Sequence, residues 1–111
     1  GLENQCVNPA HYSATITAIR VPDGVDADEL RRVALEHFDV SLGTGLNKVK
    51  GKVFRIGHLG DMNELMLMGA LSGVEMALSI AGIPFQRGGV NAALDYFAQT
   101  ATVKPKLAVN A

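Results

Sequence analysis

The stretch at residues 52–65, KVFRIGHLGDMNEL, decides the fold because it joins a predicted strand to a predicted helix. Its first half alternates, and side chains along a strand point to its two faces in turn. Phe54 and Ile56 therefore belong to one face, while Arg55 belongs to the other. The pattern predicts a β-strand with one fixed cation among apolar residues.

The second half of this stretch predicts a helix N-terminus. Asp61 can accept hydrogen bonds from the free N–H groups of a first turn, and Glu64 completes a capping box with it. Gly57 and Gly60 lie between Arg55 and this cap, where a backbone without Cβ atoms can pass close to a ligand. A guanidinium, a bare turn and a helix N-terminus each favour an anion.

A long helix is expected to follow over residues 62–81, and a last helix over residues 90–101. Gly82 is expected to end the long helix in a left-handed conformation, since Pro84 cannot continue it. Interior glycines cost about 1 kcal/mol each relative to alanine, so we expect another element to pack closely against the small residues of this helix. These small residues recur at every fourth position: Gly69, Gly73, Ala77 and Ala81.

The first part of the chain predicts one strand and one helix. β-branched residues alternate over residues 13–21, which predicts a strand that ends at a Pro-Asp-Gly turn. Asp26 is a good N-cap, and apolar residues follow it at helical spacing, so an amphipathic helix is predicted over residues 26–37. Arg31 and Arg32 are expected on its solvated face, among acidic neighbours.

A glycine-containing segment connects this helix to the strand at residues 53–57. Residues 40–42 are a short strand candidate, and Gly43-Thr44-Gly45 follows them. A phosphate-binding loop would need a third glycine and a helix directly after it, and neither is present. We therefore predict a flexible connection between two antiparallel strands, with backbone contact to an active site as the alternative.

Length and composition are those of one globular domain. The chain has 111 residues, of which 48% are hydrophobic and 19% charged, and this is enough for a single core. A net charge of −1 offers no general attraction to nucleic acid or to an anionic membrane, and Glu75 interrupts the longest apolar run. Cys6 is the only cysteine, which excludes an intrachain disulfide. The predicted elements make an α+β two-layer sandwich, with a small antiparallel sheet of three or four strands and three helices.

Three segments of the chain form a recognisable set: VFRIGHLGD at residues 53–61, its continuation at 63–73, and GIPFQRGGV at 82–90. They resemble the C-terminal small domain of class V pyridoxal-phosphate aminotransferases, in particular the serine–glyoxylate and alanine–glyoxylate aminotransferases. The resemblance extends from about residue 13 to about residue 98. It implies a linker segment at residues 1–12, the small domain at 13–102 and a tail at 103–111.

The resemblance also implies which residues bind substrate. In that family the arginine of the RIGxxG motif holds the α-carboxylate of an amino-acid or oxo-acid substrate, and by position this residue is Arg55. Gly57 and His58 are the other substrate-binding candidates of the motif. The implied cofactor is pyridoxal 5′-phosphate, bound mainly by a larger domain that precedes this one. The implied whole enzyme is a cytoplasmic homodimer acting on small amino acids and oxo-acids.

The catalytic groups of transamination are not recognisable in the sequence. A lysine that forms a Schiff base is desolvated so that its amine is neutral. The lysines here fall in polar loops, at a strand entrance or in the tail: Lys48, Lys50, Lys52, Lys104 and Lys106. His11, His37 and His58 are far apart and lack a second ligand at metal-binding spacing, so no metal site is predicted. We expect the chain alone to be inactive, with its catalytic lysine elsewhere.

Three alternatives remain open at this point. Arg55 could form a structural ion pair with Asp61, Glu64 or Asp95. The chain could be a non-catalytic module that binds a small carboxylate by itself or regulates another protein. It could also be a purely structural part of a dimer.

Overall fold

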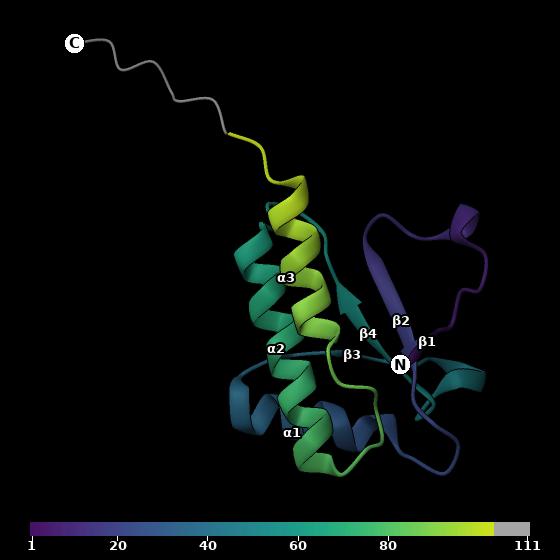
Figure 1. Cartoon of the computed structure of the whole chain (residues 1–111). Coiled ribbons are helices and arrows are strands. Elements are labelled where there is room, and N and C mark those ends of the chain that lie inside the picture. The colour runs from purple at the N-terminus through teal and green to yellow at the C-terminus, as the bar shows by residue number, and fades with distance from the viewer. Residues whose placement is uncertain (104–111) are drawn as a thin grey trace.

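The computed structural model describes residues 1–103, which form one sheet and three helices (Figure 1). The fold is α+β with a four-stranded antiparallel sheet, as the sequence predicts. The tail predicted for residues 103–111 lies outside the described residues, apart from Val103. In chain order the elements are β1 (Glu3–Asn4), β2 (Ile16–Arg20), α1 (Ala27–Phe38), β3 (Gly43–Thr44), β4 (Val53–Gly57), α2 (Glu64–Ala81) and α3 (Gly89–Thr100), with short 3₁₀ turns at Pro9–His11 and Asn47–Val49.

β4 lies between β2 and β3, in a sheet whose strand order is β1-β2-β4-β3. Phe54 and Ile56 are buried in the core together with residues of α1 and α2. Arg55 belongs to the opposite face, where its neighbours across the strands are Ala18 on β2 and Gly43 on β3. In Figure 1, α2 and α3 lie side by side on one side of the sheet. Arg55 is therefore on the face that is turned away from α2 and α3.

Two short strands differ from the sequence prediction. β1 pairs with β2 in a segment that shows no periodicity. The strand candidate at residues 40–42 is wrong, because the paired residues are Gly43 and Thr44, opposite Arg55 and Phe54 of β4. Leu42 is instead buried in the core. A strand of two residues is too short for an alternating pattern to reveal it.

The ends of α2 are set by one capping side chain and one glycine. The predicted cap, Asp61, is wrong, since the side chain of Asn63 accepts from the Met66 N–H at 2.9 Å. Glu64 is then the first helical residue, so the predicted capping box does not form. Aspartate and asparagine are equally good N-caps, and the sequence alone does not choose between them. Gly82 ends the helix in the left-handed region, with φ 69°, as predicted.

The small residues of α2 pack closely in only part of the row. A Cβ added at Gly73 would lie 2.8 Å from Cγ2 of Val40, in the segment just after α1. One turn later, Ala77 is fully buried. A Cβ added at Gly69 would meet nothing within 4 Å. The predicted close contact is therefore confirmed at Gly73 and wrong at Gly69.

α2 is the central helix of this fold. By length and composition alone it could also cross a membrane, with 18 residues of mean hydropathy 1.4 despite Glu75. In the structure it contacts both α1 and α3. Val74, Ala77 and Leu78 join the same core as the sheet, although the helix has further buried residues. The buried residues of α2 are Met68, Gly73, Val74, Ala77 and Leu78.

Candidate functional site

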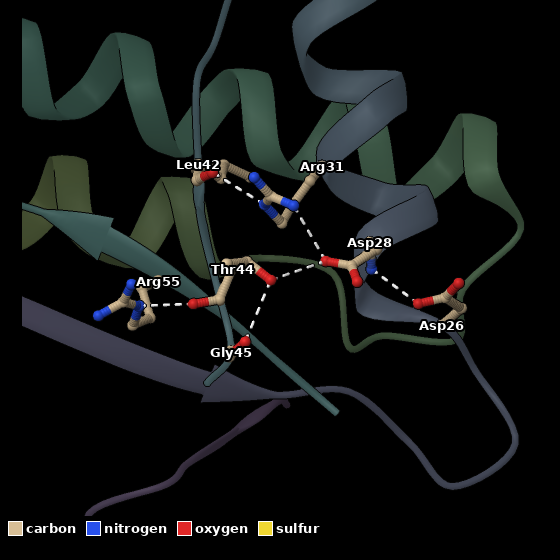
Figure 2. A network of polar contacts seen from close by, with 7 residues as sticks. All are labelled: Asp26, Asp28, Arg31, Leu42, Thr44, Gly45 and Arg55. Atoms are coloured by element: carbon tan, nitrogen blue, oxygen red, sulfur yellow. Dashed lines mark hydrogen bonds and ion pairs between the residues drawn. The ribbon is translucent and has the colours of Figure 1, made fainter. Parts of the chain in front are cut away.

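Arg55 is half-buried, and one of its three side-chain nitrogens is already bonded within the domain. Its Nε–H donates to the carbonyl oxygen of Thr44 at 2.7 Å (Figure 2). Nη1 and Nη2 make no hydrogen bond to any residue in 1–103, and Figure 2 shows them pointing away from Thr44. The guanidinium thus presents an outer edge with two parallel donors, the geometry that matches a carboxylate.

The alternative of a structural ion pair is wrong for the part of the chain that the structure describes. The acidic residues that could form it are Asp61, Glu64 and Asp95. All ion pairs among residues 1–103 are formed within α1. No carboxylate of these three residues therefore lies within 4.0 Å of the Arg55 guanidinium. Arg55 therefore keeps a positive charge without an acidic partner among residues 1–103, and this charge is available to a ligand or to another part of the protein.

Thr44, which holds Nε of Arg55, is itself anchored to the first turn of α1. Its Oγ1 donates to Oδ1 of Asp28 at 3.1 Å, and the same oxygen accepts from Nη1 of Arg31 at 3.0 Å. Nε of Arg31 in turn donates to the carbonyl oxygen of Leu42 at 2.9 Å. As Figure 2 shows, α1 is thereby hydrogen-bonded to the β3 segment on both sides of Gly43, at Leu42 and at Thr44.

The arginine pair on α1 divides between two environments. Arg32 is exposed and pairs with Glu29 and Glu36, as expected of a solvated face. Its hydrogen bond to Glu29 is the main reason why the pKa of that carboxyl lies below the ordinary value. The solvated-face prediction is wrong for Arg31, which is turned towards the β3 segment and is bonded to Asp28. Both pairs have the same spacing of three residues, so spacing does not reveal which pair faces inward.

Glycines shape the surface on both sides of Arg55. A Cβ at Gly43 would lie 3.1 Å from Cβ and 3.3 Å from Nε of Arg55, so the arginine side chain passes directly over Gly43. A Cβ at Gly57 would meet nothing within 4 Å, so the surface beyond Arg55 is open. A Cβ at Gly45 would come within 2.8 Å of Cγ2 of Val53. The segment after Thr44 thus connects two antiparallel strands, β3 and β4, as predicted, and it is closely packed where it begins at Gly45.

His58 does not lie beside Arg55. Its Nδ1 is 3.2 Å from the carbonyl oxygen of Ala14, which can only accept, so Nδ1 carries a hydrogen. Its Nε2 is 2.9 Å from the hydroxyl of Thr17. The ring lines a hollow with Phe97 and the start of α2, on the helix-covered side of the sheet. The structure thus places the two predicted side-chain contacts, His58 and Arg55, on opposite faces.

The described residues do not fit a site for pyridoxal phosphate. Its Schiff-base lysine must be desolvated, whereas Lys48, Lys50 and Lys52 are all exposed. Lys104 and Lys106 lie outside the described residues. Residues 1–103 likewise contain no group of three side chains placed to bind a metal ion. What this region offers is a cation aimed at an open surface.

Comparison with known proteins shows similarity over nearly the whole chain, although no protein-family model matches it. The serine–glyoxylate aminotransferase of Arabidopsis thaliana is 52% identical over 97 residues, covering 86% of this chain and 24% of that protein. The L-aspartate–glyoxylate aminotransferase of Paracoccus denitrificans is 44% identical over 109 residues, covering 97% of this chain and 28% of that protein. The structure of pyridoxamine–pyruvate aminotransferase from Mesorhizobium loti matches 91% of this chain and 26% of its own, with a TM-score of 0.82 and 34% identity. The chain spans about a quarter of the length of the relatives it matches.

Proposed function

We propose that this chain is the C-terminal small domain of a longer aminotransferase of the glyoxylate type. The premise is that it belongs with the C-terminal small domains of class V aminotransferases. The sequence resemblance to this family is confirmed by the relatives and by the shared fold. Because the chain spans only a quarter of those relatives, the transfer reaction belongs to the longer protein. Its substrates are then small amino acids and oxo-acids, and its pyridoxal phosphate and Schiff-base lysine lie mainly in the preceding large domain. We further propose a cytoplasmic homodimer, as the resemblance implies.

Within that enzyme, Arg55 binds the substrate carboxylate. The observation that supports this role is the outer edge of its guanidinium, which is free of partners among residues 1–103 and lies on the sheet face turned away from α2 and α3. Pyridoxal phosphate supplies the electron sink of the reaction when it is bound. The part played by Arg55 is to fix the direction of the substrate, because the bond broken at its Cα must stand correctly relative to the cofactor ring.

The two neighbours of Arg55 in the motif take different roles. Gly57 follows it on the same sheet face and has no atom where a Cβ would stand, so it leaves room for the substrate. His58 ties the end of β4 to the start of β2 through Thr17 and Ala14. We propose that His58 supports the loop after Arg55 from the helix-covered side.

The experiment that tests this function is the substitution Arg55→Ala in the full-length enzyme that contains this chain. Two charge-assisted hydrogen bonds are lost, so kcat/KM for the amino donor should fall about a hundredfold, equivalent to ~3 kcal/mol. Arg32→Ala is the matched control, because Arg32 is an exposed arginine whose partners all lie on α1. An unchanged specificity constant for Arg55→Ala would show that this arginine is structural.

The second candidate function is a non-catalytic module that recognises a carboxylate by itself. Two features together favour it: the outer edge of the Arg55 guanidinium is free, and every lysine among residues 1–103 is exposed, so none is desolvated for Schiff-base chemistry. Calorimetry on the 111-residue chain with serine, alanine and glyoxylate separates the two functions. A domain of a larger enzyme should bind these acids with a Kd of about a millimolar or weaker, since the rest of the site is absent. Micromolar binding would support the independent module.

A further inference from the structure

We propose that Thr44, Asp28 and Arg31 are positioning residues that aim the guanidinium of Arg55. The proposal rests on the function assigned to Arg55 above and adds the means by which its direction is set. Three hydrogen bonds lead from α1 to Arg55: Arg31 to Asp28, Thr44 to Asp28, and Arg55 to Thr44. Figure 2 shows this path running from the first turn of α1 across β3 to β4.

The path begins on a rigid element. Ala27 and Leu30, which flank Asp28 in the first turn of α1, are both fully buried in the core. The Asp28 N–H is also capped by Oδ1 of Asp26 at 2.9 Å. The Asp28 carboxylate therefore has a backbone that cannot shift without disturbing the core.

β3 needs this support because it is short and lies at the edge of the sheet. Within residues 1–103, Gly43 and Thr44 are its only paired residues, and β4 is its only neighbouring strand. Arg31 fixes the residue before β3 through the carbonyl oxygen of Leu42, and Asp28 fixes Thr44 through its hydroxyl. Together these contacts place the Thr44 carbonyl where it accepts from Arg55.

The Thr44 hydroxyl has a choice of two acceptors. It lies 3.1 Å from Oδ1 of Asp28 and 3.2 Å from the carbonyl oxygen of Gly45, but it carries one hydrogen. A carboxylate is the stronger acceptor, so the hydroxyl ties β3 to α1 while Asp28 is present. Without Asp28, the hydroxyl would bond within its own loop, and β3 would lose this link.

The occupied Nε determines how Arg55 can meet an acid. A carboxylate can bind an arginine along the Nε–Nη edge or along the Nη1–Nη2 edge. The Thr44 carbonyl blocks the first mode by accepting from Nε. The substrate must therefore approach the Nη1–Nη2 edge, with its carboxylate in the plane that the Thr44 bond imposes.

The test is a double-mutant cycle in the full-length enzyme, with serine as amino donor and glyoxylate as acceptor. Thr44→Val keeps the shape of the side chain and removes the hydroxyl, and it should lower kcat/KM for serine about fivefold, the effect of one ordinary hydrogen bond. In an Arg55→Met background the same substitution should have no further effect, because Thr44 acts through Arg55. Thr44→Ser should retain nearly full activity, and the surface variant Arg32→Ala should behave as the wild type.

A second variant covers the case in which Thr44→Val fails to fold. Arg31→Lys keeps a positive charge near Asp28 but removes the Nε bond to the Leu42 carbonyl, and its loss of kcat/KM should likewise vanish in the Arg55→Met background. Equal losses in both backgrounds, or no loss in either, would overturn the positioning role. If Arg55→Met alone left kcat/KM unchanged, the function proposed for Arg55 would fail instead.

Discussion

Substitution by alanine should change the stability of the chain in opposite directions at the two interior glycines of α2, Gly69 and Gly73. At Gly73 a Cβ would stand 2.8 Å from Cγ2 of Val40, well inside van der Waals contact, and 3.9 Å from Cβ of Phe38. Valine is stiff about its first side-chain torsion, so relief requires α2 to move away from the segment after α1. Overpacking of this kind costs about 1–3 kcal/mol, and the better helix propensity of alanine returns about 1 kcal/mol. Gly73→Ala should therefore destabilise the chain by about 1 kcal/mol.

Gly69→Ala is the matched control, one helical turn away on the same helix. No atom lies within 4 Å of the added Cβ, so only the propensity gain of about 1 kcal/mol remains. Thermal unfolding followed by circular dichroism should show melting temperatures about 4 °C lower for Gly73→Ala and about 4 °C higher for Gly69→Ala. Equal stabilisation by both substitutions would refute the close approach of α2 to Val40.

Two further predictions concern helix ends and charge. Asn63→Ala should destabilise the chain by about 1 kcal/mol through loss of the cap on the Met66 N–H, whereas Asp61→Ala should change the urea midpoint little; the reverse order would restore Asp61 as the cap. The hydrogen bond from Arg32 lowers the pKa of Glu29. The Arg32–Glu29 ion pair therefore stabilises the fold at pH values above the ordinary carboxyl pKa, and this stabilisation is lost as the pH falls through the lowered pKa. Arg32→Met should accordingly lower the melting temperature near pH 7 but not near pH 2, and an equal effect at both pH values would contradict this linkage.

The sequence predicts the face of Arg55 because a period of two is a strong signal over five residues. Phe54 and Ile56 are both buried, and this determines the side on which the arginine lies. The same count assigns residue 58 to the side of residues 54 and 56, so parity alone could have separated His58 from Arg55. The motif places these residues close together in the sequence, but closeness in sequence does not mean that their side chains share a face of the sheet.

The contacts that hold Arg55 could not be predicted in the same way. Its partner is the backbone carbonyl of Thr44, and every residue has a carbonyl, so the sequence has no mark for it. β3 is too short to show a pattern, and Asp28 and Arg31 have the spacing of any exposed helical pair. These contacts follow from tertiary packing, which brings the start of α1 against the sheet edge.

The most direct test of the role of Arg55 is a crystal structure of the full-length enzyme with a carboxylate substrate analogue bound. We predict both oxygens of the carboxylate at about 2.7–2.9 Å from Nη1 and Nη2 of Arg55, with Nε still donating to the Thr44 carbonyl. A carboxylate bound by another cation, with the outer edge of Arg55 paired to an acidic side chain, would contradict the account.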